Sequence, residues 1–95
     1  MAAYVVAELE VTDPAGFDEY RKAVPATITA YGGRYLVRGG ALDPLEGGWV
    51  PKRIVILEFP SVAQAKAWYT SVEYRDLLKQ RQRASKSKVV LVEGV

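Results

Sequence analysis

Five side chains in this sequence could bind or transform a small molecule. Together they provide one carboxylate, one guanidinium group and three aromatic rings, two of which carry hydroxyls. A cofactor-free oxygenase or isomerase could use the carboxylate or a tyrosine for proton transfer and the arginine to hold an anionic intermediate. The predicted ligand-binding residues are Arg38, Glu58, Trp68, Tyr69 and Tyr74.

Glu58 is the candidate catalytic residue, because it interrupts the apolar stretch VILEF of a predicted strand. A buried carboxylate must be paired, or its pKa rises. A raised pKa would suit a general acid or base. The alternative is that Glu58 lies at the rim of the sheet and pairs with an arginine such as Arg38 or Arg53, since structural ion pairs also perturb pKa values.

The aromatic candidates also have structural interpretations. Trp68 and Tyr69 could form a wall for a flat ligand, but adjacent helix residues point about 100° apart. Large aromatic residues dominate small cores, so Trp68 is expected to pack on the sheet. Tyr69 and Tyr74 carry hydroxyls that need partners when buried, which favours them as site residues. On the first helix, Tyr20 and Arg21 could reach the same cleft, or could be ordinary amphipathic residues.

Composition excludes several classes of site. The chain has 95 residues, which predicts one domain over residues 1–95, and it contains neither Cys nor His. Disulfides, thiol nucleophiles and histidine ligands are therefore excluded. The acidic residues near the N-terminus fall on different predicted elements, so we predict no metal and no cofactor. The glycine pairs at 39–40 and 47–48 fit no phosphate-binding motif.

Charge and hydropathy argue against nucleic acid and membranes as partners. The net charge of +2 is weak, and the basic segment 75–88 has no interleaved aromatic residue. No apolar stretch approaches the roughly 18 residues that a membrane span needs. The N-terminus has no basic region and meets Glu8 too early for a signal peptide. A cytoplasmic location is the expectation.

Hydrophobic periodicity and capping residues define the elements that must position the candidate residues. Asp13, Ser61 and Ser71 suit helix N-caps. Pro25 falls inside the first helix and should kink it or divide it in two. The turn-rich segment 39–52 is the longest irregular stretch. We expect strands at 3–11, 34–39, 53–59 and 89–93, and helices at 14–31, from 62 to the break near 71, and from there to 83.

The order β-α-β-β-α-β predicts an α+β, ferredoxin-like fold, in which a four-stranded antiparallel sheet carries its helices on one face. The strands at 53–59 and 89–93 are apolar on both faces. The helices can cover only one of these faces, and a bare apolar sheet usually marks an interface. We therefore predict a homodimer through the sheet faces. The alternative is a monomer whose segment 39–52 folds over the second face.

The motifs YGGRYLVRGG, EGGWVPKRIVILEFPS, AWYTSVEY and the terminal LVEG resemble the DUF1330 family of the dimeric α+β barrel superfamily. That family typically has Pro where this chain has Val72. The resemblance covers nearly the whole chain and implies a ferredoxin-like protomer and a homodimer whose two sheets face each other. The superfamily includes cofactor-free monooxygenases and haem enzymes, but the His that typically ligates such a haem has no counterpart here.

Two functions remain open from the sequence. The first is a small-molecule binding protein or cofactor-free enzyme with a cleft between the helices and the sheet. The second is a non-catalytic dimeric module whose polar cleft residues only stabilise the fold. A deep cavity with an unpaired Glu58 and Tyr69 would favour the first, and a filled interior with Glu58 in a closed ion pair would favour the second.

Overall fold

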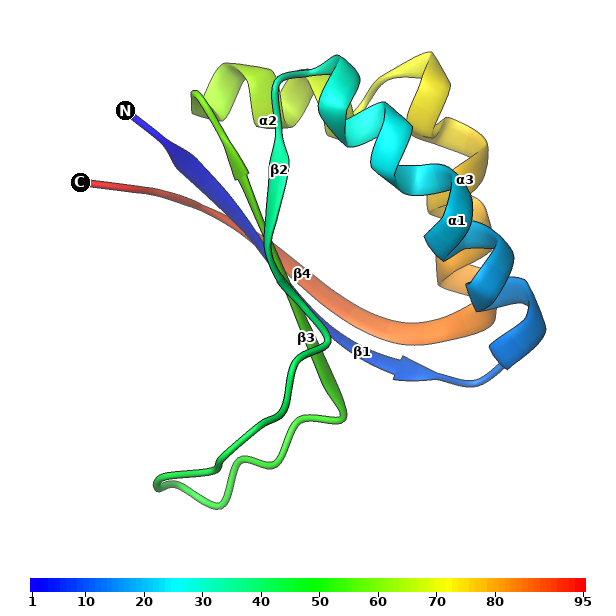
Figure 1. The fold of residues 1–95 in the computed structure, drawn as a ribbon, viewed down its shortest axis with the longest axis vertical. Helices are drawn as coiled ribbons and strands as arrows, with labels where there is room; N and C mark the ends of the chain where they lie inside the picture. The colour runs from blue at the N-terminus through cyan, green and yellow to red at the C-terminus, as the bar shows by residue number, and fades with distance from the viewer.

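A single antiparallel sheet with the strand order β2-β3-β1-β4 organises the chain. The computed structural model describes residues 1–95. All three helices pack on one face of the sheet, and the segment 39–52 extends away from its far end (Figure 1). The α+β, ferredoxin-like architecture predicted from the sequence is confirmed. The elements are β1 (Ala3–Val11), α1 (Pro14–Ala30), β2 (Arg34–Arg38), β3 (Arg53–Phe59), α2 (Val62–Tyr69), α3 (Val72–Ala84) and β4 (Ser85–Glu93).

The helices begin where their capping residues predict. The side chain of Asp13 accepts a hydrogen bond from the Gly16 backbone, and Ser61 and Ser71 cap α2 and α3 in the same way. Pro25 lies inside α1, but α1 is one continuous helix. Of the two predicted effects of Pro25, a kink or a division of the helix, the division is therefore wrong. A proline removes only one backbone donor, and the flanking turns keep their hydrogen bonds.

Strand β4 begins at Ser85, four residues before the predicted start at 89. The added residues are alternating serines and lysines, which apolar patterning cannot identify as a strand. These residues form a strand because they pair with β1, where Lys86 lies opposite Glu10 and Lys88 lies opposite Glu8. Opposite charges at directly facing positions stabilise a sheet.

The core fills the space between the helices and the sheet. Phe59 is completely buried, and its ring centroid lies 5.4 Å from that of Trp68, which in turn lies 4.2 Å from that of Tyr74. The indole of Trp68 also donates a hydrogen bond to Thr27 at 3.0 Å. Trp68 therefore packs in the core, although one edge reaches the cavity described below.

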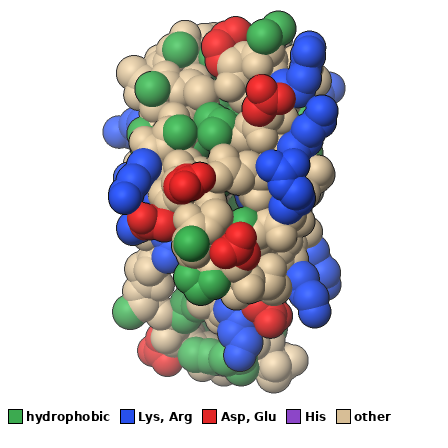
Figure 2. Space-filling view, turned by 90° about the vertical axis from the view of Figure 1, so that its right-hand side faces the viewer, with side chains coloured by type: hydrophobic (Ala, Val, Ile, Leu, Met, Phe, Trp, Pro, Cys, Tyr) green, Lys and Arg blue, Asp and Glu red, His purple; other side chains and the backbone are tan.

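The opposite face of the sheet, here called the outer face, has no covering layer. It carries apolar side chains from three strands, and Val90 is 58% exposed. The segment 39–52 reaches only part of it: Trp49 bonds to Glu8, whereas Leu45 in this segment is 89% exposed. The helix-covered side instead presents charged side chains of both signs (Figure 2). The outer-face residues are Tyr4, Val6, Ile54, Ile56, Val90 and Val92.

Truncation of the innermost aromatic residue tests this core. We expect Phe59→Ala to lower the free energy of unfolding by about 3–5 kcal/mol, because it leaves a cavity among well-packed rings. Val72→Ala is the matched control, since Val72 is 71% exposed, and it should change stability by less than about 0.5 kcal/mol. Urea denaturation measures both, and equal effects would contradict the described packing.

Candidate functional site

A cavity of about 50 Å³ lies between the helices and the sheet and opens toward solvent. Eighteen residues line it, and fourteen of them are hydrophobic. The other four are all arginines: Arg21, Arg38, Arg53 and Arg81. No carboxylate lines this cavity, so its charge is strongly positive against an apolar wall. Such a site favours an anion with an apolar body.

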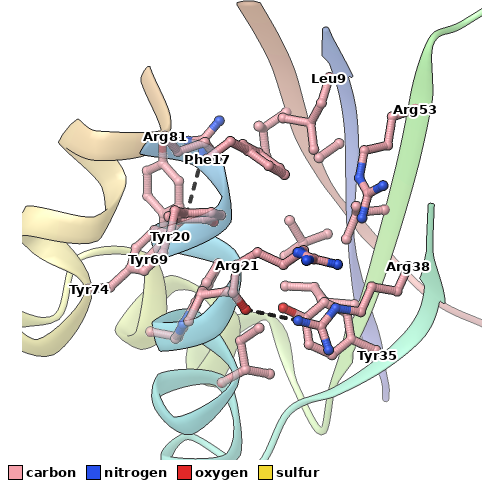
Figure 3. Close-up of a pocket in the computed structure, with 18 residues that line it drawn as sticks. Leu9, Phe17, Tyr20, Arg21, Tyr35, Arg38, Arg53, Tyr69, Tyr74 and Arg81 are labelled. Carbon is pink, nitrogen blue, oxygen red and sulfur yellow. Dashed lines mark hydrogen bonds between the residues drawn. The ribbon is translucent and has the colours of Figure 1, made fainter. Parts of the chain in front are cut away.

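Three of the arginines come from different elements and gather on the side of β2 and β3 (Figure 3). Arg21 projects from α1, Arg38 ends β2, and Arg53 begins β3. Arg21 pairs with Asp18 at 2.6 Å, whereas Arg38 and Arg53 form no salt bridge. These two guanidinium groups are the uncompensated charges at the mouth of the cavity.

A β-bulge turns Arg38 into the cavity. In β2, Tyr35 lies opposite Leu57, but the register then shifts so that Val37 lies opposite Ile56 and Arg38 opposite Val55. Strict alternation would place Tyr35 and Arg38 on opposite faces. The bulge places both on the helix-covered face, and the Arg38 guanidinium lies 4.5 Å from the centre of the Tyr35 ring. Burial raises the pKa of Tyr35, which keeps this phenol neutral.

Pro25 leaves a backbone carbonyl of α1 free to accept a hydrogen bond from Arg38. A residue at position 25 of α1 would normally donate its backbone N–H to the carbonyl of Arg21, four residues earlier. Proline has no N–H, and Nη2 of Arg38 donates to this carbonyl instead, at 2.9 Å. Because of the proline inside α1, the Arg21 carbonyl is left as an acceptor for an arginine of β2, and this hydrogen bond is the dashed line between Arg21 and Arg38 in Figure 3.

Arg53 depends on the glycine that follows β2. Gly39 has a positive φ of 71°, and a Cβ there would lie 2.3 Å from Nη1 of Arg53. The guanidinium carbon of Arg53 lies 5.8 Å from the centre of the Phe17 ring. Its Nε is buried with no hydrogen-bond partner. Arg53 therefore has unused donor capacity inside the cavity.

A second polar cluster lies on the helix side of the cavity. The hydroxyls of Tyr20 and Tyr74 are 2.8 Å apart, and Nε of Arg81 donates to the Tyr74 hydroxyl at 3.3 Å. Nη1 of Arg81 donates to Ser87 at 2.6 Å. Arg81 is only 4% exposed and has no carboxylate partner. Burial alone would lower the pKa of Arg81, but its hydrogen bond to Tyr74 and its electrostatic interactions with the oxygens of Tyr74, Tyr20 and Tyr69 together outweigh burial and raise the pKa.

The structure brings four of the five predicted site residues to the cavity and leaves Glu58 outside it. Trp68, Tyr69 and Tyr74 line the cavity together with Arg38. Glu58 lies opposite Tyr4 and Arg34 on the outer face. It accepts a hydrogen bond from Nε of Arg34 at 2.7 Å, so the alternative prediction of a structural ion pair with an arginine is confirmed, although the partner is Arg34 and not Arg38 or Arg53. Successive residues of a strand point to opposite faces of the sheet. Since Leu57 faces the helices, the neighbouring Glu58 must face away from them, and this could be read from the sequence.

Sequence reasoning missed three residues of the site. Tyr35 and Arg53 were not proposed as ligand contacts, and Arg81 was considered only as a member of the basic segment 75–88. Its neighbours Leu77 and Leu78 pack against the core, and Arg81 follows Leu77 at the i+4 spacing of one helix face. That spacing is the one sequence signal for its burial. Tyr20 and Arg21, named only as optional contributors, both line the cavity.

Comparison with known proteins agrees with this geometry. The profile of a domain of unknown function, DUF1330, matches residues 2–95. The chain belongs to the DUF1330 family. No curated protein gives a significant match. The family's description states no activity, so a function can be inferred only from the residues of the cavity.

None of the helices is long and apolar enough to cross a membrane.

Solved structures support the fold of this DUF1330 chain. A protein of unknown function from Rhodopseudomonas palustris superposes with a TM-score of 0.79 at 18% identity, covering 99% of this chain and 82% of that one. A dimeric ferredoxin-like protein from Jannaschia sp. CCS1 has a TM-score of 0.67 at 15% identity, with 99% and 100% covered. SnoaB, a cofactor-independent oxygenase from Streptomyces nogalater, has a TM-score of 0.65 at 12% identity, with 99% and 93% covered. At these identities the likeness concerns the fold.

Replacement of Pro25 tests its link to Arg38. We expect Pro25→Ala to stabilise α1 by up to about 3 kcal/mol, because the new N–H can bond to the Arg21 carbonyl. The same N–H competes with Arg38, so affinity for an anionic probe such as benzoate should fall several-fold. Thermal denaturation and calorimetric titration measure the two effects. In an Arg38→Gln background the affinity effect should vanish; an effect that persists there would contradict the link.

Proposed function

We propose that this DUF1330 protein binds a small organic anion with an apolar or aromatic body in the cavity between its helices and its sheet. The observation that carries the proposal is the composition of the cavity wall, in which every non-hydrophobic residue is an arginine. Arg81 is buried and Arg53 is half-buried, and a cation in such surroundings without a counter-charge is costly. A carboxylate, enolate or phenolate ligand would supply the missing charge.

The geometry of Arg38 and Arg53 supports this function further. Each guanidinium lies over an aromatic ring, Tyr35 or Phe17. Such a contact uses the face of a planar cation and leaves its N–H groups available, apart from the one that Arg38 donates to the Arg21 carbonyl. The edge of a guanidinium presents paired N–H groups that match the two oxygens of a carboxylate. The apolar residues farther inside would contact the ligand's body.

Catalysis in this cavity would have to use residues other than Glu58. The ion pair of Glu58 with Arg34 on the outer face removes the proposed general base from the site. The hydroxyls of Tyr20 and Tyr74 are the remaining groups in the cavity that could donate a proton. A cofactor-free oxygenase or isomerase is thus one form that the binding function could take. The alternative is a non-catalytic dimeric module in which the arginines only stabilise the fold.

A homodimer through the outer face completes the proposal. Apolar side chains of β1, β3 and β4 share this face, and similar solved structures are described as dimeric. Trp49 of the segment 39–52 donates a hydrogen bond to Glu8 at 2.6 Å, which ties this segment to the edge of the face. A second copy would cover both the face and the exposed apolar residues of the segment.

Matched anionic and neutral probes test ligand binding. We expect benzoate and 3-phenylpropanoate to raise the melting temperature of the protein, because they bind only the folded state, and the corresponding amides to raise it much less. Arg38→Gln and Arg53→Gln should each weaken anion binding by about tenfold, the effect of one charge-assisted hydrogen bond. Arg75→Gln, an exposed position on α3 that does not line the cavity, should leave it unchanged. Equal responses to acids and amides would favour the non-catalytic module.

A charge on the outer face tests the dimer. Val90→Glu should convert the protein to a folded monomer, because it places a carboxylate in the centre of an apolar interface, where a buried charge without a partner is unfavourable. Val72→Glu introduces the same charge on the helix-covered side and should leave a dimer. Sedimentation velocity gives the mass and circular dichroism the folded state. A monomeric parent protein at micromolar concentration would refute the assembly.

A further inference from the structure

The polar cluster formed by Tyr20, Tyr74 and Arg81 has more hydrogen-bond donors than the protein has acceptors for them. The hydrogen bond between the two hydroxyls uses one of their two protons. Whichever tyrosine donates, the other hydroxyl proton meets no protein acceptor. Arg81 donates through Nε and Nη1, and its remaining N–H groups make no hydrogen bond within the protein.

The three residues of this cluster are buried and belong to the cavity wall. Tyr20 is 9% exposed, Tyr74 is 1% exposed and Arg81 is 4% exposed, and all three line the cavity. Burial raises the pKa of Tyr20, so its phenol keeps its proton at neutral pH and remains a donor. Unpaired donors in such surroundings are unfavourable by themselves. An oxygen acceptor at this position would satisfy a hydroxyl and the guanidinium together.

The two polar parts of the cavity lie on opposite sides of an apolar space. Arg81 and the tyrosines lie beneath the helices, whereas Arg38 and Arg53 lie on the side of β2 and β3 (Figure 3). Hydrophobic residues of α1, β3 and α2 line the space between them. They include Val24, Leu57 and Trp68.

We infer that the ligand has two oxygen-bearing ends. The anionic end binds Arg38 and Arg53, and a second acceptor oxygen binds the Tyr20–Tyr74 hydroxyl pair and Arg81, with an apolar segment between the ends. This inference rests on the proposed function and narrows its ligand to small organic acids that carry a keto, phenolate or carboxylate oxygen away from the first acid group. A plain aliphatic or aromatic monoacid would leave the inner donors unsatisfied.

A pair of probes with the same shape tests the inner end. In 4-acetylbenzoate a carbonyl oxygen replaces one methyl group of 4-isopropylbenzoate. The corresponding 3-arylpropanoates form a second, longer pair for the same comparison. We expect the parent protein to bind the acetyl compound of at least one pair about tenfold more tightly, the effect of one hydrogen bond inside a protein. Isothermal titration calorimetry at neutral pH measures the affinities.

Removing the tyrosine hydroxyls tests whether the preference for the acetyl compound comes from the cluster of Tyr20, Tyr74 and Arg81. Tyr74→Phe and Tyr20→Phe each remove one hydroxyl, and each should reduce the preference to about twofold or less while binding of 4-isopropylbenzoate persists. Two variants are used because one of them could fail to fold. Tyr31→Phe is the matched control at the C-cap of α1, since the Tyr31 hydroxyl bonds to Glu73 outside the cavity, and it should retain the full preference.

The outcomes separate this inference from the proposed function. If the parent binds the acetyl and isopropyl members of both pairs equally, the inner acceptor site is refuted while anion binding stands. A preference that survives in both Tyr20→Phe and Tyr74→Phe refutes it equally. If neither acid binds the parent protein, the proposed function and this inference both fail.

Discussion

Positive charge along the wall of an apolar cavity that no carboxylate lines is the constraint on which the site depends. Four guanidinium groups share the wall of one small cavity, and only Arg21 has an acidic partner, at its outer edge. The protein tolerates the others by placing them against aromatic rings, a backbone carbonyl and tyrosine or serine hydroxyls. These contacts hold the cations in position but leave their charge unbalanced. The unbalanced charge is the reason the cavity is better suited to an anion than to a neutral ligand.

Irregularities of the backbone, rather than regular elements, aim the arginines. A bulge in β2 turns Arg38 onto the helix-covered face, the missing N–H of Pro25 leaves a carbonyl for it, and the absent side chain of Gly39 makes room for Arg53. Each feature costs local stability. All three converge on the mouth of the same cavity. Their convergence is easier to understand as the construction of a site than as three unrelated imperfections in the fold.

The same sheet serves two purposes with its two faces. The helix-covered face encloses the cavity, and the outer face is apolar and is the surface through which we propose that two copies associate. Because residues alternate along a strand, Leu57 faces the cavity while Ile56 and Glu58 face outward on β3. The ion pair of Glu58 with Arg34 therefore belongs to the outer face. A carboxylate that looked catalytic in the sequence is a structural partner of an arginine on the neighbouring strand.

The sequence alone determined the order of the elements, their caps and the ferredoxin-like sheet, because hydrophobic periodicity and capping residues act over a few positions. It also indicated Arg38, Trp68, Tyr69 and Tyr74, whose residue types stand out locally. Only the tertiary structure decided which residues meet in the cavity. The bulge in β2 reversed the side that Arg38 faces, the pairing of β1 with β4 extended β4 to Ser85, and the packing of α3 buried Arg81. These outcomes depend on register and contacts between segments far apart in the chain, which no local pattern of residues records.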